Sequence, residues 1–514
     1  MLVLGDIARL NARRRGDKKA LIMGEESLTF EELNKAVNRM ARGLAGIGLN
    51  PGDRVALWSH NCLEFLPIVF AVWKCGAVVV PVNFRFKAEE AGHVFNNSRP
   101  KILFHEEGLT ALAEETLKGS STSTMPISIS GEGLGGGKSL KELSCGQSDE
   151  EPAFEPDPSS AAMIMYTSGT TGTPKGVIFS HFRELSDVTN TSMEVDIRPE
   201  DIMLVNMPMF HNGGLSLSAM TSLLHGCSCV IQGGSFDPEG WFSTIERFGI
   251  SVANVVPTML AKLVSHPGMG DYNLGSLKKL IYGSSPITES VLSAVLKVFK
   301  VDFYQTYGQT ETGMLLVLKP SDHFTERSRF TGRPLLRADM RVVDENGRDV
   351  SVGEVGEIIS RQKPLGMDGY YGMQEATRET IRDGWIYTGD LARAEPGGYF
   401  TIVDRLKDMI ISGSENIYCK EIENVIIEHP GVEEVSVFGI PDEIWNESVC
   451  AVVVPKAQHE LSESEIISFC ASRLSGYKKP KRVEIREELP KNAAGKVVKK
   501  KLREPYWSGK DKRV

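Results

Sequence analysis

Apolar residues recur along this chain at two spacings, one typical of an amphipathic helix and the other of a short buried strand. The segment Thr29–Gly48 has the helical spacing and begins with the capping-box pair Thr29 and Glu32. Its apolar face consists of Leu33, Val37, Met40 and Leu44. After a turn, Arg54–Trp58 forms an apolar strand. The same alternation continues through the first four hundred residues and predicts an α/β architecture.

The longest apolar stretch, Phe65–Val82, approaches the length of a membrane span. Lys74, Gly76 and two prolines interrupt it. We therefore expect a buried helix, a glycine break and a core strand that ends at Pro81. We expect no integral membrane span and no targeting segment.

Two later regions depart from the alternating pattern. Gly119–Pro158 is rich in Ser, Thr, Gly, Glu and Pro, so we expect an exposed connection without regular structure. After residue 404 the pattern becomes that of a small α+β domain, in which the capping box Ser462 and Glu465 begins one helix. About a hundred residues can fold independently. We predict an N-terminal domain of residues 1–404 and a C-terminal domain of residues 405–514.

Composition limits the classes of function. The chain has 514 residues, which is more than a single hydrophobic core usually supports, and a formal net charge of −9. No basic field is available for nucleic acid, so we expect no nucleic-acid partner. The closest cysteines, Cys227 and Cys229, have neither redox nor zinc spacing. Reduced thiols in a cytoplasmic protein fit best.

The segment Tyr166–Val177, with the sequence YTSGTTGTPKGV, concentrates groups that bind phosphate. It offers backbone N–H donors, several hydroxyls and the cation of Lys175. A Walker A loop ends in Gly-Lys-Ser/Thr, whereas here Pro174 precedes the lysine and Gly176 follows it, which excludes that kinase scaffold. By composition alone such a run is as often a flexible surface loop. Apolar segments on both sides instead indicate a loop between two buried strands.

This loop and four further segments resemble the signatures of the adenylate-forming superfamily, which includes acyl-CoA synthetases, luciferases and nonribosomal peptide adenylation domains. The four segments are Tyr307–Glu311 (YGQTE), Tyr387–Leu391 (YTGDL), Asp404–Asp408 (DRLKD) and Pro490–Lys496 (PKNAAGK). Their order is that of the superfamily, and the resemblance covers essentially the whole chain. It implies a large domain of helix-flanked β-sheets with a small β-barrel subdomain, followed by a small mobile α+β domain.

The resemblance implies a site for ATP and Mg²⁺. The segment assigned to the β- and γ-phosphates consists of Thr167, Ser168, Gly169, Thr170, Thr171, Gly172 and Lys175. Glu311 is the implied metal ligand, together with Thr167, because a hard cation prefers oxygen. Without its motif, a Thr-Glu pair is more often a surface feature. Tyr307 would stack on adenine, and Thr310 would contact the α-phosphate.

Further nucleotide contacts follow from the same resemblance. Gly283, Ser284 and Ser285 match the segment on the other side of adenine, where the glycine permits close backbone approach. The two serines stand where Gly or Ala is commoner. Asp390 matches the carboxylate that holds the ribose hydroxyls, although an Asp after Gly is usually a turn residue. Arg405 matches an arginine that adds a nucleotide contact.

Lys496 is the implied catalytic residue of adenylation. Its ammonium would bridge the incoming carboxylate and the α-phosphate as charge builds; by composition alone it would be a solvated lysine. Lys407 matches the hinge about which the C-terminal domain rotates. The second orientation would present a CoA-binding segment, Ser412, Gly413 and Ser414, in which Ser414 replaces a common glycine.

The acyl site is implied less directly. His211 lies where the superfamily often has a His or an aromatic residue near the carboxylate, although a lone histidine between apolar residues is more often a core residue. Asn212 stands near the Asp of amino-acid-activating relatives, which disfavours an amino acid substrate. Acetate-specific relatives have Trp in place of Gly308, so we expect a larger acid, with Gly283 and Met314 also lining the pocket. Medium-chain fatty, cyclic and aromatic acids remain open.

These observations predict an ATP-dependent, AMP-forming acyl-CoA synthetase whose partners are a small carboxylic acid, ATP and CoA. A homodimer is compatible with the sequence. One alternative is an acyl-AMP ligase that delivers to a carrier protein. The other is a catalytically silent nucleotide-binding scaffold, which the retained chemistry disfavours. The retained residues are Lys175, Glu311, Asp390, Arg405 and Lys496.

Overall fold

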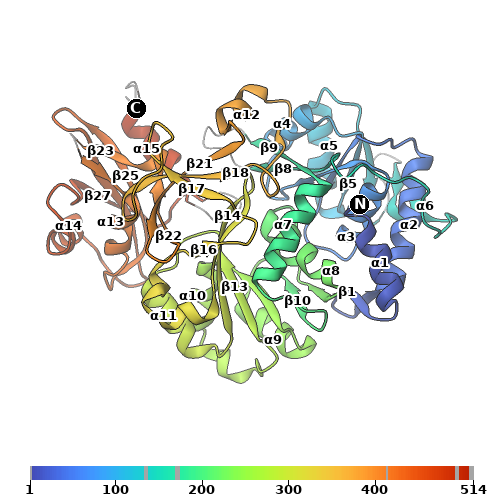
Figure 1. Ribbon diagram of the computed structural model, residues 1–514, viewed down its shortest axis with the longest axis horizontal. Coiled ribbons are helices and arrows are strands. Elements are labelled where there is room, and N and C mark those ends of the chain that lie inside the picture. Colours follow the sequence, from blue (N-terminus) through green and yellow to red (C-terminus); the bar gives the residue numbers. More distant parts are fainter. Residues whose placement is uncertain (1–2, 132–136, 168–173, 413–414, 492–496, 509–514) are drawn as a thin grey trace. The chain divides into compact units, whose positions relative to one another are not determined.

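Helices and strands alternate along the N-terminal four hundred residues, as the apolar pattern predicts (Figure 1). The computed structural model describes residues 3–131, 137–167, 174–412, 415–491 and 497–508. Within these ranges the strands form four sheets. The first has the order β16-β15-β14-β13-β12-β10-β11-β1-β2. Its strands are β1 (Lys19–Met23), β2 (Glu26–Thr29), β10 (Ile202–Val205), β11 (Ser228–Ile231), β12 (Val252–Val255), β13 (Lys279–Gly283), β14 (Asp302–Gln309), β15 (Gly313–Leu318) and β16 (Arg333–Pro334).

The second sheet has the order β19-β9-β8-β4-β3-β5-β6-β7. Its strands are β3 (Arg54–Trp58), β4 (Val78–Val82), β5 (Ile102–His105), β6 (Met125–Ser128), β7 (Lys138–Ser139), β8 (Ala161–Thr167), β9 (Lys175–Ser180) and β19 (Gly369–Tyr370). The helices that accompany the first two sheets are α1 (Asp6–Arg15), α2 (Phe30–Gly46), α3 (Phe65–Lys74), α4 (Ala88–Ser98), α5 (Thr110–Gly119), α6 (Leu140–Ser144), α7 (His181–Glu194), α8 (Thr221–His225), α9 (Pro238–Phe248), α10 (Pro257–Ser265), α11 (Glu289–Val298) and α12 (Gln374–Thr380). A π-helix, η3 (Gly213–Met220), precedes α8.

The amphipathic elements are confirmed where the sequence pattern was strongest. Helix α2 begins after Thr29, whose hydroxyl accepts the Glu32 N–H, and its apolar face is buried. Helix α3 and strand β4 divide the long apolar stretch at Gly76, which adopts a φ of 68°. No helix among the described residues combines the length and apolar character needed to cross a membrane.

The expectation of an irregular connection over Gly119–Pro158 is wrong in part. Strand β6 adds to the second sheet beside β5, and Ile127 on it is buried. Leu140 and Leu143 of the short helix α6 are also buried. Three well-spaced apolar residues are enough to dock short elements onto a sheet, although the average composition of the segment is polar.

The remaining sheets lie later in the chain. The predicted small barrel is a half-barrel sheet with the order β17-β18-β21-β20 and with β22 beside β21. Its strands are β17 (Met340–Val343), β18 (Val355–Arg361), β20 (Ile381–Arg382), β21 (Trp385–Glu395) and β22 (Tyr399–Arg405). The fourth sheet consists of β23 (Ile410–Ser412), β24 (Glu415–Ile417), β25 (Val432–Asp442), β26 (Asn446–Pro455) and β27 (Arg482–Ile485). Its helices are α13 (Cys419–Ile426), α14 (Glu463–Ala471), which begins at the predicted Ser462 cap, and α15 (Lys499–Trp507).

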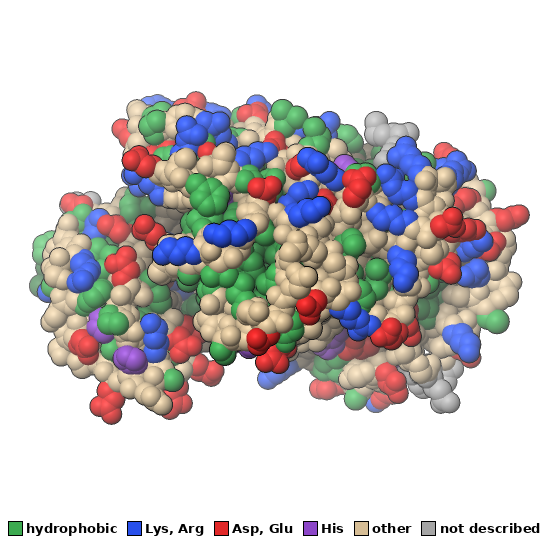
Figure 2. All heavy atoms as spheres, turned by 90° about the horizontal axis from the view of Figure 1, so that it is seen from below, with side chains coloured by type: hydrophobic (Ala, Val, Ile, Leu, Met, Phe, Trp, Pro, Cys, Tyr) green, Lys and Arg blue, Asp and Glu red, His purple; other side chains and the backbone are tan. Residues whose placement is uncertain are grey.

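The chain divides into two compact units. The first comprises Met1–Met340 and Ser360–Tyr387, and the second comprises Arg341–Ile359 and Thr388–Val514. The domain boundary at residue 404 stays a prediction, because compactness alone does not locate a hinge. All eight cysteines carry free thiols. On the face shown in Figure 2, basic and acidic side chains are interspersed, in keeping with the absence of a basic field in the sequence.

Candidate active site

The hairpin β8–β9 holds the two ends of the predicted phosphate loop. Thr167 and Lys175 pair across it, and the Thr167 hydroxyl donates to the Lys175 carbonyl at 3.5 Å. A Cβ atom at Gly176 would lie 2.7 Å from Ile164 Cγ2, so only glycine fits there. The intervening predicted residues lie outside the described ranges: Ser168, Gly169, Thr170, Thr171 and Gly172. Strand pairing therefore places Lys175 at the mouth of this loop.

A tyrosine that the sequence reasoning missed lies beside Lys175. The Lys175 Nζ atom is 4.9 Å from the centroid of the Tyr370 ring, within the range of a cation–π interaction. Strand β19, which carries Tyr370, pairs antiparallel with β9, and Tyr370 stands opposite Val177. The same sheet therefore carries both the cation and the ring.

Glu311 contacts the other end of this tyrosine. The Tyr370 hydroxyl donates to Glu311 Oε1 at 3.0 Å, and the Met367 N–H donates to the Glu311 carbonyl oxygen at 2.7 Å. Burial raises the pKa of Tyr370, and the neighbouring carboxylate raises it further, so the phenol stays protonated at neutral pH. The structure thus brings Lys175, Tyr370 and Glu311 together.

The donor set near Glu311 suits Mg²⁺. Among the described residues, Glu311 Oε2 has no hydrogen-bond partner, and no group of three or more His, Cys, Asp or Glu side chains gathers as a ready metal cage. Mg²⁺ is usually held by one or two carboxylates together with substrate phosphates and water, so a single carboxylate beside a phosphate loop fits. The Thr167 hydroxyl is directed at its own hairpin.

A buried ion cluster supports the turn that carries Thr310 and Glu311. Arg183 on α7 pairs with Glu184 at 2.8 Å and with Asp187 at 3.4 Å, and these three side chains are at most 3% exposed. Arg183 Nη2 also donates to the Thr310 carbonyl oxygen at 3.2 Å. Burial raises the pKa of both carboxyl groups, and Arg183 opposes that rise. Helix α7 is thereby joined to the turn.

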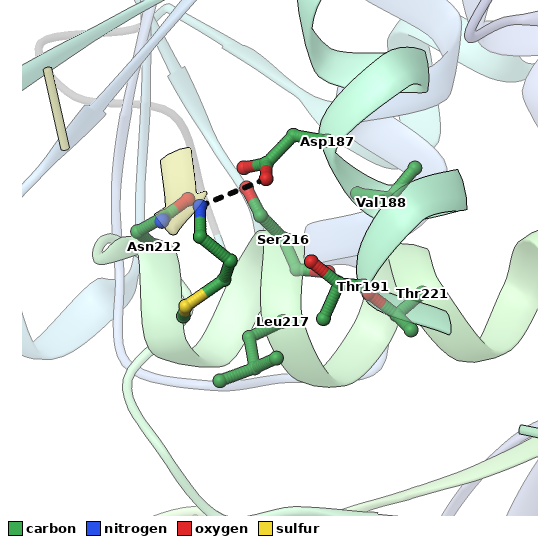
Figure 3. Close-up of a pocket in the computed structure, with 8 residues that line it drawn as sticks. Asp187, Val188, Thr191, Asn212, Ser216, Leu217 and Thr221 are labelled. Carbon is green, nitrogen blue, oxygen red and sulfur yellow. Dashed lines mark hydrogen bonds between the residues drawn. The ribbon is translucent and has the colours of Figure 1, made fainter. Parts of the chain in front are cut away.

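Asp187 extends the cluster to the start of β15. Its Oδ1 accepts the Met314 N–H at 2.9 Å, the bond that is dashed at Asp187 in Figure 3. Gly313 approaches so closely that a Cβ atom there would lie 2.8 Å from the Asp187 carboxyl group. Asp187, Met314 and Asn212 line one narrow pocket with residues of η3. The pocket does not admit a water molecule, so it does not by itself hold an acyl group.

His211 precedes the π-helix η3, a rare element that is frequent at functional sites. Its Nδ1 accepts the Gly213 N–H at 3.3 Å, so in the neutral ring Nε2 carries the proton. Gly214 has no room for a side chain, because a Cβ atom would lie 2.3 Å from the Pro208 carbonyl oxygen. Of the two glycines that follow Asn212, Gly214 is therefore required by backbone packing.

The predicted adenine segments lie on neighbouring parallel strands. Gly283 on β13 pairs with Thr306 on β14, and a Cβ atom at Gly283 would lie 2.2 Å from the Thr306 carbonyl oxygen. Ser284 has a φ of 67°, a conformation that side chains other than glycine rarely adopt. Tyr307 follows Thr306 directly. Strand pairing therefore brings together the two segments that the resemblance assigns to adenine.

Gly308 has a local structural reason for its small size. A Cβ atom there would lie 2.2 Å from the Gly313 carbonyl oxygen, across the β14–β15 hairpin. The absence of a side chain at this position therefore does not by itself leave an empty acyl space. The preference for an acid larger than acetate stays a prediction.

In the second unit, Asp390 and Arg405 pair directly across β21–β22. The Arg405 Nε atom lies 2.9 Å from Asp390 Oδ1, and the Asp390 side chain is 5% exposed. Lys407 lies on an exposed single turn, η7 (Leu406–Asp408), and Ser412 ends β23. Gly413, Ser414 and Lys496 lie outside the described ranges. Asp390 and Arg405, both predicted nucleotide contacts, therefore pair with each other.

Comparison with known proteins assigns the family. Residues 8–371 match the family described as AMP-binding enzyme, and residues 421–496 match the AMP-binding enzyme C-terminal domain. The chain belongs to the AMP-binding enzyme family. A feruloyl-CoA synthase from Amycolatopsis sp is 36% identical over 507 residues, which cover 98% of this chain and 99% of the relative. A fatty acid–[acyl-carrier-protein] ligase from Streptomyces coeruleorubidus is 35% identical over 98% of this chain and 96% of its own.

A solved structure extends the match to the whole fold of this AMP-binding enzyme. The crystal structure of an anthranilate CoA ligase in complex with anthranoyl-AMP has a TM-score of 0.90 at 25% identity and covers 98% of this chain and 97% of the ligase. Tyr370 lies at the end of the matched N-terminal region. The Gly369-Tyr370 pair after a short turn carried no chemical signal in the sequence alone. Arg183 and Asp187 carried one, because they place opposite charges four residues apart on a helix.

Proposed function

We propose that this AMP-binding enzyme is an ATP-dependent, AMP-forming carboxylate:CoA ligase. The supporting observation is that Lys175 and Glu311 meet on Tyr370 beside the phosphate loop. Joining a carboxylate to the α-phosphate brings two anions together, so the site must supply positive charge and an oriented metal ligand. The substrate is an acid larger than acetate. Ferulate and anthranilate, named in two similar ligases, are the first acids to test.

In the first half-reaction, a carboxylate oxygen bonds to the α-phosphorus while the bond to the bridging oxygen breaks, and pyrophosphate leaves. Lys175 and the loop N–H groups would hold the β- and γ-phosphates, and Lys496 would neutralise charge at the α-phosphate. His211, whose Nδ1 accepts the Gly213 N–H, would contact the carboxylate. Mg²⁺ held by Glu311 would neutralise phosphate charge when bound.

In the second half-reaction, the CoA sulfur bonds to the acyl carbon, the bond from that carbon to the AMP oxygen breaks, and the thiol proton passes to solvent. Asp390 and Arg405 would hold the ribose throughout. Lys407 would serve as the hinge, and residues 412–414 would line the thiol channel. A cytoplasmic location and a homodimer stay part of this proposal; free thiols persist in a reducing compartment.

One panel tests the proposal. The protein is incubated with MgATP and a series of fatty, cyclic and aromatic acids, with and without CoA, while pyrophosphate, AMP and the thioester are measured. We expect pyrophosphate only when a suitable acid is present, and acyl-CoA with stoichiometric AMP when CoA is added. If no acid in the panel increases the release of pyrophosphate or AMP, a nucleotide-binding scaffold is the better description.

Delivery to a carrier protein is the second candidate. The observation in its favour is the 35% identity to a ligase named for an acyl-carrier protein. The same panel separates the two acceptors. Pyrophosphate release in which CoA neither speeds AMP release nor yields a thioester would favour the carrier protein.

A further inference from the structure

Tyr370 is buried at the meeting point of two groups that the proposed function uses. Its side chain is 8% exposed, its ring faces the Lys175 ammonium, and its hydroxyl is bonded to Glu311. Its own N–H donates to the Thr377 hydroxyl at 2.9 Å, which fixes the backbone from which the side chain extends. Neither the phosphate loop nor the YGQTE motif includes this residue.

We propose that Tyr370 is a positioning residue that orients Glu311 toward the metal and Lys175 toward the phosphates. The inference rests on the proposed function, because it takes the ligand of this site to be a magnesium–nucleotide complex. Tyr370 itself does not contact the reacting atoms. It acts by holding the two groups that do.

The Tyr370 hydroxyl fixes the orientation of the Glu311 carboxylate. A glutamate side chain has several rotatable bonds, and the phenol bond to Oε1 restricts them. Oε2 then has no protein partner among the residues that the structure describes, so it remains available to a cation. Hydrogen bonds of this kind to metal-binding groups usually affect metal affinity about tenfold or more.

The Tyr370 ring restricts the position of the Lys175 ammonium. A lysine ammonium on a four-carbon stem is mobile unless an attractive surface restrains it, and an aromatic face is such a surface. Because one side chain supplies both the face and the hydroxyl, Lys175 and Glu311 are held at a fixed separation. A tyrosine with only a packing role would not need a carboxylate partner, since a backbone carbonyl would also satisfy its buried hydroxyl.

The experiment separates the hydroxyl from the ring. Tyr370→Phe removes the hydroxyl and keeps the ring, and Tyr370→Leu removes both. Tyr371→Phe is the matched control, because this neighbouring side chain lines a different pocket, with Ile164 and Ile178. Binding of a nonhydrolysable ATP analogue is measured by calorimetry over a range of Mg²⁺ concentrations, and thermal unfolding checks that each variant is folded.

We expect Tyr370→Phe to raise the Mg²⁺ concentration for half-saturation about tenfold, with analogue affinity at saturating Mg²⁺ nearly unchanged. Tyr370→Leu should in addition weaken binding at saturating Mg²⁺. On a Glu311→Gln background, Tyr370→Phe should have no further effect on Mg²⁺ dependence. Equal Mg²⁺ dependence in Tyr370→Phe and Tyr371→Phe, or a full additional loss on the Glu311→Gln background, would overturn the assignment.

This readout is independent of the acid. If the wild type binds the magnesium–analogue complex but no acid releases pyrophosphate, the proposed ligase function fails while the role of Tyr370 is still decided by the Mg²⁺ titration. If the wild type does not bind the analogue at all, both proposals are overturned.

Discussion

Each unit contains a cluster of paired charged side chains, fully buried in the first unit and partly buried in the second, and the two clusters are built differently. In the first unit, Arg183, Glu184 and Asp187 all come from α7 and support the turn at Thr310. In the second unit, Lys499 pairs with Glu423 at 2.8 Å. Glu423 lies on α13 and Lys499 begins α15, three residues after Lys496.

The charge balance differs as well. The first cluster has two carboxyl groups for one guanidinium, and burial raises the pKa of both. In the second, burial alone lowers the pKa of Lys499, but surrounding acidic groups outweigh this and raise it overall. Asp404, whose oxygens accept the N–H groups of Arg405 and Lys420, ties the predicted hinge segment to α13. The first cluster connects one helix, α7, to the turn at Thr310. The second cluster connects α13 to α15, which are distant in sequence.

Arg183→Met should have the largest effect on stability. It would leave two buried carboxyl groups without their cation, which typically costs about 3–5 kcal/mol of the free energy of unfolding. Urea unfolding measures this change. A loss below about 1 kcal/mol in the free energy of unfolding would show that the cluster does not stabilise the turn at Thr310. Arg183→Lys, which keeps a charge but not the bond geometry, is the matched control and should recover only part of the loss.

In the second unit, Lys496→Ala should lower the rate of adenylation and leave the stability of the protein unchanged. We expect adenylation to slow about a hundredfold or more, equivalent to roughly 2.7–4 kcal/mol in the transition state, because one charge donor at the α-phosphate is removed. The second step, thioester formation from supplied acyl-adenylate, should continue. Acid-dependent pyrophosphate exchange measures the first step. A normal adenylation rate would remove Lys496 from the mechanism.

Lys499→Met should lower the free energy of unfolding by an amount between the effects of Arg183→Met and Lys496→Ala. Glu423 would keep the Val437 N–H at 3.0 Å and Lys420 at 3.7 Å, so we expect a loss of about 1.5–3 kcal/mol, less than for Arg183→Met. Because Lys499 anchors the helix that follows Lys496, adenylation should slow more than thioester formation from supplied acyl-adenylate. Equal slowing of both steps would indicate a purely structural role. Lys501→Met, at an exposed position on the same helix, is the control.

The pH dependence of stability should also distinguish the clusters. The folded-state pKa of Asp187 is raised above its ordinary 3.8, so its stabilising contribution is complete below that value and is lost as pH rises through the folded pKa. The cost of Asp187→Asn should therefore shrink between about pH 5 and about pH 8. The pKa of Lys499 is raised above 10.5, so the cost of Lys499→Met should stay constant over that range. Urea unfolding at both pH values checks each; a cost of Asp187→Asn that grows with pH would contradict this assignment.

Much of the local structure followed from the sequence. The capping pair Thr29–Glu32, the apolar strand Arg54–Trp58 and the glycine break at Gly76 each specify backbone geometry within a few residues, and the structure has them at the predicted places. The short elements between Gly119 and Pro158 did not follow, because a single buried residue such as Ile127 decides them through contacts with a distant strand.

The ordered motifs alone determined the family and the set of residues to examine, because phosphate binding and adenylation require particular chemical groups in short segments. Only the tertiary structure decided which groups meet. Tyr370 reaches Lys175 through strand pairing and Glu311 through one hydrogen bond, and the partners lie 195 and 59 residues away along the chain. No local pattern encodes such contacts, since they depend on the register of β19 against β9 and on how the sheet places the turn after β14.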